Sequence, residues 1–316
     1  MLAILGITTP IFLLIGLGYI ARWSGIIQRD QMQGVGVFVL YCALPALVIR
    51  ALTQQPLEDI FKLHYLIAYG LGSIAVFGAG LLLCLKLQRQ PLNASAMQAL
   101  GMAAANSGFV GYPLAAMVIG SPAAVLLALN MLIENLLVIP AALILAEMDN
   151  HQGSSVWKTV KQTALNLIKN PILVGLLTGI CLAVSGVKIP APLFKAIDML
   201  AEAAGPAALF VIGGALFGLQ VKGMANDVGQ IVVGKLLIHP LVIFIAFYFV
   251  PDIDPLYMAG ALLFAASPMI SIYPLFGQRY GLGGVSAASM LVATVASFFT
   301  LSLIIWLMTL SGLMAF

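Results

Sequence analysis

The sequence predicts an all-α polytopic membrane protein, in which ten helices cross the bilayer as two inverted repeats of five. Three observations lead to this prediction: an apolar composition, ten apolar runs long enough to span a membrane, and a match of the chain with itself at one fixed offset. The 316 residues are 62% hydrophobic and 8% charged, whereas a soluble domain carries roughly 25% charged residues. Because so few charges cannot cover a water-facing surface, the net charge of +3 is attributed to loops and not to a nucleic-acid surface.

The predicted spans follow from length. A helix that crosses a hydrocarbon core ~30 Å thick needs roughly 20 residues. Apolar runs of that kind fall at 3–21, 34–52, 64–86, 94–119, 122–146, 171–187, 192–219, 228–250, 255–278 and 284–312. The polar stretch 147–170 separates the two sets of five and is predicted to be a cytoplasmic linker. The predicted units are therefore a first repeat at 1–146 and a second repeat at 171–316.

Basic residues orient the predicted spans, because cytoplasmic loops carry an excess of Lys and Arg. With the N-terminus outside, nine Lys and Arg residues fall on the inner side. Four fall on the outer side, namely Arg50, Lys62, Lys188 and Lys195. Both termini are therefore predicted outside, with the chain in the plasma membrane, which is the bacterial inner membrane.

The repeat appears when the sequence is compared with itself at an offset of 161 residues. The stretch NSGFVGYPL at 106–114 then falls on SPMISIYPL at 267–275. Three prolines of the first half meet prolines of the second: Pro10 with Pro171, Pro45 with Pro206, and Pro113 with Pro274. Because each half has an odd number of spans, the second copy is predicted to enter the membrane upside down, as in many secondary transporters.

The two matched stretches predict helix breaks in the fourth and ninth spans, at about Gly108–Pro113 and Pro268–Pro274. Proline lacks an N–H and clashes with the preceding turn, and irregular backbone at membrane depth is tolerated only when it is buried in protein or lines a wet cavity. A half-helix is predicted to start at each proline. Two helix N-termini that face each other place partial positive charge at the membrane centre, which favours an anion. The alternative for either proline alone is a simple kink.

The predicted substrate-binding residues lie at or beside these breaks, with two asparagines added from the fifth span. They are Asn106, Ser107, Gly108, Pro113, Ser267, Pro268, Ser271, Tyr273, Pro274, Asn130 and Asn135.

Three ionisable residues lie inside predicted spans. Buried charges in membranes are costly and usually functional, so each of these residues is a candidate functional group. Glu134 lies one turn from Asn130 and could carry a proton, bind a cation, or balance Lys235. Lys235 could neutralise the carbonyl ends of the broken helices, and His239 lies one turn further along. No cofactor is expected, and neither metal-ligand spacing nor a catalytic pair is present, so an enzyme is not predicted.

Five stretches together resemble the auxin efflux carrier family of membrane transporters, in its short bacterial form. They are PIFLLIGLGYIARWSGII, VFVLYCALPALVIRAL, NSGFVGYP, NLLVIPAALIL and GKLLIHPL. The resemblance implies the fold of sodium/proton antiporters and bile-acid transporters. In that fold, spans 1, 2, 6 and 7 form a scaffold, often dimeric, and spans 3–5 and 8–10 move around crossed helices 4 and 9.

The resemblance also implies a substrate class. Plant relatives export the carboxylate hormone auxin, and bacterial relatives are associated with malonate and other small organic acids. Asn106 matches the asparagine of the first break in the plant carriers, while Ser267 and Ser271 stand where those carriers have an asparagine in the second break. This departure speaks against an aromatic, auxin-like substrate.

The sequence therefore predicts a secondary active or potential-driven transporter of a small organic anion, working by alternating access, with H⁺ or Na⁺ coupling left open. A homodimer through the scaffold helices is expected. One alternative is a cation/proton antiporter, for which Glu134 is the candidate carboxylate at the crossing. Another is a non-transporting membrane sensor that signals through residues 147–170.

Overall fold

The computed structural model describes residues 2–54, 62–148, 161, 165, 169–187, 189–219, 224–250 and 253–313. The regular secondary structure of this part of the chain is helical, and its strand-like pairing is confined to one isolated bridge between Ala105 and Met269. The first half contains α1 (Leu2–Trp23), α2 (Arg29–Phe38), η1 (Val39–Ala43), α3 (Leu44–Gln54), α5 (Leu63–Leu82), η2 (Leu83–Leu87), α6 (Leu92–Ala103), η3 (Ser107–Gly111), α7 (Tyr112–Ile119), α8 (Pro122–Ile133), η4 (Glu134–Val138) and α9 (Ile139–Met148). The second half contains α11 (Pro171–Ser185), α12 (Ala191–Leu216), α13 (Ala225–Val233), η5 (Gly234–Ile238), α14 (His239–Tyr248), α15 (Pro255–Ala266), α16 (Tyr273–Arg279) and α17 (Gly283–Leu310).

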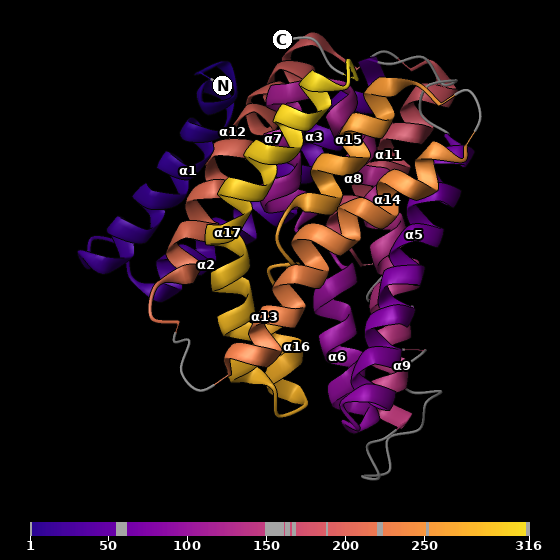
Figure 1. Ribbon diagram of the computed structural model, residues 1–316. Coiled ribbons are helices and arrows are strands. Elements are labelled where there is room, and N and C mark those ends of the chain that lie inside the picture. The colour runs from indigo at the N-terminus through magenta and orange to yellow at the C-terminus, as the bar shows by residue number, and fades with distance from the viewer. Residues whose placement is uncertain are drawn as a thin grey trace.

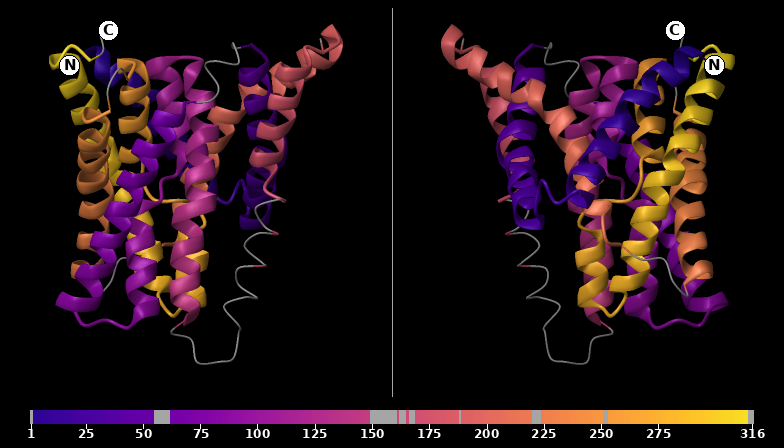
Figure 2. Two further views of the ribbon diagram at one scale, coloured as in Figure 1. Left: turned by 90° about the vertical axis from the view of Figure 1, so that its right-hand side faces the viewer. Right: turned by 90° about the vertical axis from the view of Figure 1, so that its left-hand side faces the viewer.

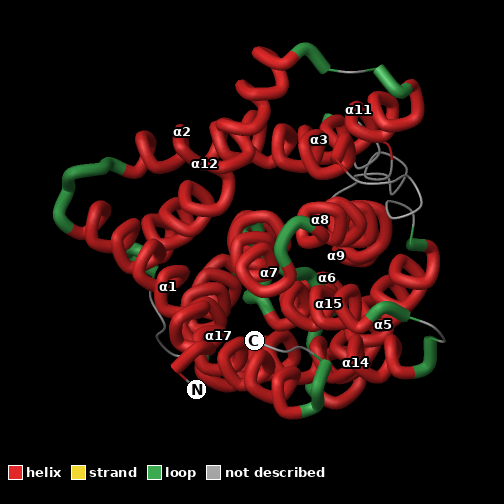
Figure 3. The backbone as a smooth tube through the Cα atoms, turned by 90° about the horizontal axis from the view of Figure 1, so that it is seen from above, coloured by secondary structure: helices red, strands yellow, loops and turns green. Residues whose placement is uncertain are grey.

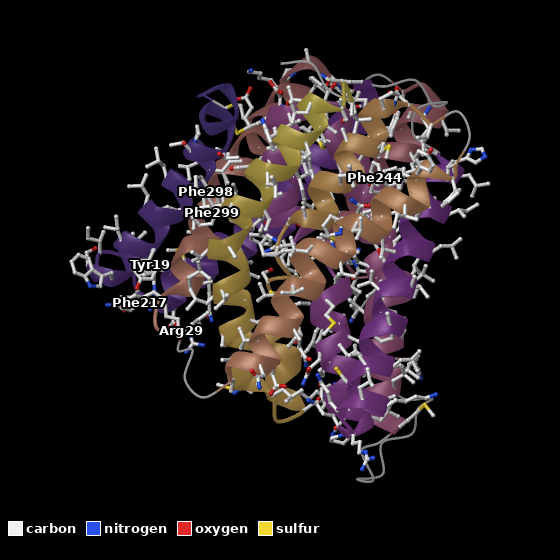
Figure 4. All side chains as sticks on the ribbon, viewed as in Figure 1. Tyr19, Arg29, Phe217, Phe244, Phe298 and Phe299 are labelled. Carbon is white, nitrogen blue, oxygen red and sulfur yellow. The ribbon has the colours of Figure 1, made fainter. Side chains whose placement is uncertain are left out.

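The prediction of an all-α polytopic membrane protein is confirmed at this level. Six continuous helices are long and apolar enough to cross a membrane: Arg29–Gln54, Leu63–Leu87, Pro122–Met148, Ala191–Leu216, Ala225–Tyr248 and Gly283–Leu310. Large apolar side chains also cover the outside of the molecule, as Phe244 and Phe299 illustrate in Figure 4. Lipid, and not water, is the solvent for which such a surface is suited.

Several prolines within the helices are accommodated by π-helical turns. Four of the π turns end two residues before a proline: η1 before Pro45, η3 before Pro113, η4 before Pro140 and η5 before Pro240. Proline cannot donate to the carbonyl four residues back, and its ring crowds that carbonyl. A widened turn relieves the crowding while most of the helical hydrogen bonding continues. Glu134 opens η4, and Lys235 is the second residue of η5.

The helices form two groups, which Figure 3 shows from above. The panel comprises α1, α2, α3, α11 and α12, and it curves around the bundle, which comprises α5–α9 and α13–α17. In Figure 1, α1 begins and α17 ends at the same end of the molecule, here called the terminal end. The further views in Figure 2 show the panel standing beside the bundle, displaced toward that end.

Glycines allow the panel helices to approach closely. α1 packs on α12, where a Cβ atom added to Gly18 would lie 1.9 Å from the Phe210 carbonyl oxygen. α3 packs on α11, where a Cβ at Gly175 would lie 2.9 Å from Pro45 Cα. Near the ends of α1 and α12, the ring centroids of Tyr19 and Phe217 lie 5.7 Å apart. Figure 4 labels both residues.

Arg50 and Lys195, counted as outer-side charges, lie within the predicted spans 34–52 and 192–219 and in the helices α3 and α12. One predicted boundary differs from the structure. Glu147, assigned to the linker, lies in α9 and accepts a 2.8 Å hydrogen bond from the Tyr280 hydroxyl. Lys188 and most of the predicted linker lie outside the described residues.

Candidate functional site

The first break lies between α6 and the half-helix formed by η3 and α7. α6 ends at Ala103, and the half-helix begins at Ser107, with Asn106 as its N-cap. The Asn106 side chain accepts a 3.3 Å hydrogen bond from the Phe109 amide, because the first N–H groups of a helix lack partners within it. The predicted half-helix start at Pro113 is therefore wrong. The π turn η3 accommodates Pro113, and the helix starts six residues earlier.

The second break lies between α15 and α16. α15 ends at Ala266 and α16 begins at Tyr273, so Pro274 occupies the first turn, as the sequence predicts. The two breaks meet: Ala105 and Met269 form an antiparallel bridge, and the Asn106 amide donates to the Pro268 carbonyl at 2.7 Å. The chain therefore pairs its two irregular segments with each other, which satisfies backbone groups that the membrane cannot.

Glu134 supports the first break. Its Oε1 atom accepts from the Ala105 amide at 3.1 Å and from the Ser107 hydroxyl at 2.8 Å. The side chain is buried. A carboxylate is the natural partner for N–H groups that a helix end leaves unpaired. The Ser107 hydroxyl, which was predicted to bind the substrate, therefore donates its hydrogen bond to Glu134.

Lys235 supports the second break with the opposite charge. Its Nζ atom donates to the Ala265 carbonyl at 2.8 Å, in the last turn of α15, and lies 2.7 Å from His239 Nδ1. The other ring nitrogen of His239 lies 3.1 Å from the Ser73 hydroxyl of α5. Each buried charge thus matches the polarity of the helix end that it contacts.

The two predicted asparagines of the fifth span lie away from the pairing of the breaks. Asn130 accepts a 3.0 Å hydrogen bond from the Tyr65 hydroxyl. Asn135 donates to the Met131 carbonyl at 2.8 Å and accepts from Asn170, the N-cap of α11, at 3.3 Å. Asn135 therefore joins the bundle to the panel.

Sequence reasoning missed a polar face on α5. Tyr65 and Ser73 contact Asn130 and His239, and Tyr69 lies between them with its ring 5.9 Å from that of His239. Tyr65, Tyr69 and Ser73 follow one another at intervals of four residues, which places their side chains on one face of a helix. This spacing in the sequence could therefore have identified the polar face. Among the described residues, the Tyr69 hydroxyl and Asn130 Nδ2 are buried without a hydrogen-bond partner.

The remaining predicted residues have three kinds of surroundings. Ser267 donates to the Phe264 carbonyl at 2.7 Å, and the Tyr273 ring is buried against Gly101 of α6, so both hold the second break in place. Gly108 and Pro113 face the panel, near Leu44 and Gly205 respectively. Ser271 is partly exposed. Within the described part of the chain, no group of His, Cys, Asp and Glu could hold a metal ion.

Comparison with known proteins places the whole chain in one family. Residues 4–307 match the family model described as membrane transport protein. The "Putative malonate transporter" of Rhizobium meliloti (strain 1021) is 29% identical over 319 residues, which covers 100% of this chain and 99% of that protein. The "Uncharacterized transporter YfdV" of Escherichia coli (strain K12) is 25% identical over 218 residues, 66% of this chain and 67% of that protein. The chain therefore belongs to the membrane transport protein family, the auxin efflux carrier family that its sequence resembles.

Proposed function

We propose that this chain is a secondary active or potential-driven transporter of a small organic anion, such as malonate, and that the anion binds where the two breaks meet. The observation that carries the proposal is the hydrogen bond between Asn106 and Pro268, which joins two interrupted helices inside an apolar bundle. Discontinuous helices that meet near the midplane form the substrate sites of many secondary transporters. The full-length similarity to a protein named for malonate supports the choice of substrate.

The chemistry of the breaks suits a carboxylate. The half-helix that starts at Ser107 and the helix α16 both direct their first N–H groups toward the crossing. The Asn106 side chain caps the first half-helix through its oxygen, so its NH₂ group is the end available to a carboxylate. Ser271, which is partly exposed, supplies a hydroxyl on the opposite side. Ser107 acts through its hydrogen bond to Glu134.

The buried charges balance the site. One carboxylate, Glu134, and one ammonium, Lys235, leave the crossing with no net side-chain charge when both are ionised. An incoming anion is then attracted by the helix N-termini, without repulsion from an unmatched carboxylate. Protonation of Glu134 would add to that attraction, and this is the route by which transport could couple to protons. His239 holds Lys235 in position through their 2.7 Å contact.

The packing supports ten spans in two inverted repeats. α1 packs on α12, and α11 packs on α3. If the first span corresponds to the sixth and the second to the seventh, each of these two contacts is the repeat equivalent of the other. We propose that the panel is the scaffold and the site of homodimer contact, that the bundle moves, and that both termini lie outside.

The cover of the two breaks differs, and this difference indicates the conformation. η3 and α7 pack extensively against α12 of the panel, whereas, among the described helices, α16 has no comparably extensive packing against α2 or α3. Ile272 and Leu275 are 44% and 64% exposed at the second break, while Asn106 is 4% exposed at the first. We infer that this conformation closes the site toward the terminal end. The alternate conformation would exchange the two arrangements.

One observation favours a second candidate, a cation/proton antiporter. Glu134 touches the first break, where a carboxylate would bind a cation as readily as it would carry a proton. In that case the permeating ion would be positive, and Lys235 would be the group that releases it.

Uptake of labelled malonate into proteoliposomes tests the proposal, with succinate, lactate and indole acetate as unlabelled competitors. We expect saturable uptake that Asn106→Ala abolishes and that Asn93→Ala, an asparagine at the start of α6, leaves intact. If no acid enters or competes under proton and sodium gradients, the anion proposal is wrong. Cation-driven pH changes inside the vesicles would then identify the antiporter.

A further inference from the structure

Two buried polar groups of the bundle have a hydrogen-bonding capacity that the protein itself does not use. The Tyr69 hydroxyl of α5 and the Nδ2 atom of Asn130 of α8 are buried without a hydrogen-bond partner among the described residues. Tyr69 is 1% exposed, and Asn130 is 0% exposed. Buried polar groups are costly when unpaired, so native proteins pair nearly all of them with protein groups or ordered water. These two groups therefore indicate a small polar ligand.

The packing of α5 brings the two groups to the same side of a tyrosine pair. The rings of Tyr65 and Tyr69 are stacked, with centroids 5.8 Å apart and an angle of 8° between their planes. Both rings pack edge-to-face on α14, Tyr65 against Phe247 at 5.3 Å and Tyr69 against His239 at 5.9 Å. The Tyr65 hydroxyl donates to Asn130 Oδ1 at 3.0 Å. Because the two rings share one helix face and one orientation, the Tyr69 hydroxyl also points toward α8.

Glu134 lies beside this place. It follows Asn130 by one helical turn, on the same face, and it opens η4, which packs against α5. Its Oε1 atom accepts from the Ala105 amide and the Ser107 hydroxyl of the first break. A carboxylate has about four acceptor positions, so Glu134 can accept a further hydrogen bond.

We propose that Tyr69 and Asn130 hold one buried water molecule, which hydrates the Glu134 carboxylate. The Tyr69 hydroxyl and the Asn130 NH₂ group donate to the water oxygen, and the water donates to Glu134. Buried waters typically make about three hydrogen bonds of this kind. Water suits the place better than an ion, because two donors disfavour a cation and the neighbouring carboxylate disfavours an anion.

The water gives Tyr69 a positioning role in transport. A buried carboxylate stays ionised only when it is paired and hydrogen-bonded, and the water adds one hydrogen bond to those from the first break. Tyr69 thus favours the ionised Glu134 that balances Lys235. This role rests on the proposed function, whereas the water site rests on the packing of α5 against α8.

Radiolytic labelling detects the water directly. Hydroxyl radicals that X-rays produce from a bound water oxidise the buried side chains beside it, and mass spectrometry measures the rate. Tyr273 is the matched control, because it is also a tyrosine with 1% exposure. We expect Tyr69 to be oxidised several-fold faster than Tyr273, and Asn130→Leu to reduce its rate to that of Tyr273. Equally slow oxidation of both tyrosines in the wild type would overturn the water site.

Two double variants test whether both groups bind the same water. Tyr69→Phe and Asn130→Leu each remove one partner, so the fall in melting temperature of the double variant should be smaller than the sum of the single falls. Tyr69→Phe with Asn135→Ala is the control, because Asn135 contacts Met131 and Asn170 instead. The falls in that pair should add. Additive falls in Tyr69→Phe/Asn130→Leu would contradict a shared water.

Malonate uptake into proteoliposomes tests the positioning role. Tyr69→Phe keeps the ring and loses the hydroxyl, so we expect a several-fold lower maximal rate with a KM close to that of the wild type, because the hydroxyl acts through Glu134 and not on the anion. Tyr248→Phe, at a tyrosine of α14 that is 72% exposed, should transport normally. A normal maximal rate in Tyr69→Phe would overturn the positioning role. A wild type that takes up no organic anion would overturn the proposed function and leave the labelling and melting results unaffected.

Discussion

The two breaks occupy equivalent places in the two halves of the chain, yet their surroundings differ. The first is capped by Asn106, supported by the carboxylate of Glu134 and covered by α12. The second is supported by the ammonium of Lys235, and Ile272 beside it is half exposed.

The difference bears on the proposed transport by two inverted repeats. Glu134 pairs with amide and hydroxyl donors, and Lys235 pairs with a carbonyl acceptor, so the two supports have opposite charge. In the proposed function, a site built this way is neutral overall and presents helix N-termini to an anion. The unequal cover of the two breaks is the basis for the inference that the site is closed toward the terminal end.

Removing one support should have the largest effect on this balance. Lys235→Met leaves the Ala265 carbonyl without its donor and Glu134 without its counter-charge. In soluble proteins, leaving one buried charge unmatched costs about 3–5 kcal/mol, so we expect a strongly lowered melting temperature and loss of transport. Thermal unfolding in detergent measures the first, and malonate uptake the second.

The double variant sharpens that prediction. Adding Glu134→Gln to Lys235→Met removes the unmatched charge, so the double variant should melt at a higher temperature than Lys235→Met alone. If the fall in melting temperature of the double variant equals the sum of the falls in the two single variants, the two supports act independently. That result would contradict a shared charge balance.

A smaller effect is expected where Tyr273, in the first turn of α16, packs against α6. In Gly101→Ala the new Cβ would lie 2.6 Å from the Tyr273 ring, which is buried. Overpacking of this kind typically costs about 1–3 kcal/mol, and α16 should shift with Tyr273. We expect reduced malonate uptake with a modest fall in melting temperature. Gly78→Ala is the control, because nothing lies within 4 Å of its added Cβ. Equal malonate uptake and equal melting temperatures of the two variants would contradict the idea that the packing of Tyr273 on Gly101 fixes the position of α16.

The smallest effect is expected at the asparagine pair between bundle and panel. Asn135→Ala removes the hydrogen bond from Asn170, and such contacts between membrane helices average about 0.6 kcal/mol. Because the contact joins the panel to the bundle, which move apart in the proposed transport cycle, the variant should alter the rate of transport more than the melting temperature. A melting shift as large as that of Gly101→Ala, with an unaltered rate, would show that Asn135 is purely structural.

Composition and proline spacing predicted the helical membrane class and the two interrupted spans, because both depend on local backbone chemistry. The position of the first break was misjudged because a π turn at Ser107–Gly111 accommodates Pro113 without ending the helix. The contact of Ser107 with Glu134 depends on how the fifth span approaches the fourth, which no local pattern encodes.

A disulfide between panel and bundle tests most directly whether the bundle moves. A Cβ atom at Gly205 of α12 would lie 3.7 Å from Pro113 Cβ of α7, within the usual Cβ separation of a disulfide. Gly72 and Ala246, both in the bundle, offer a control pair at 3.6 Å. We expect oxidation of Gly205→Cys/Pro113→Cys to stop malonate uptake and reduction to restore it, while the oxidised control pair still transports. Normal uptake by the fully cross-linked Gly205→Cys/Pro113→Cys protein would contradict movement of the first break away from the panel.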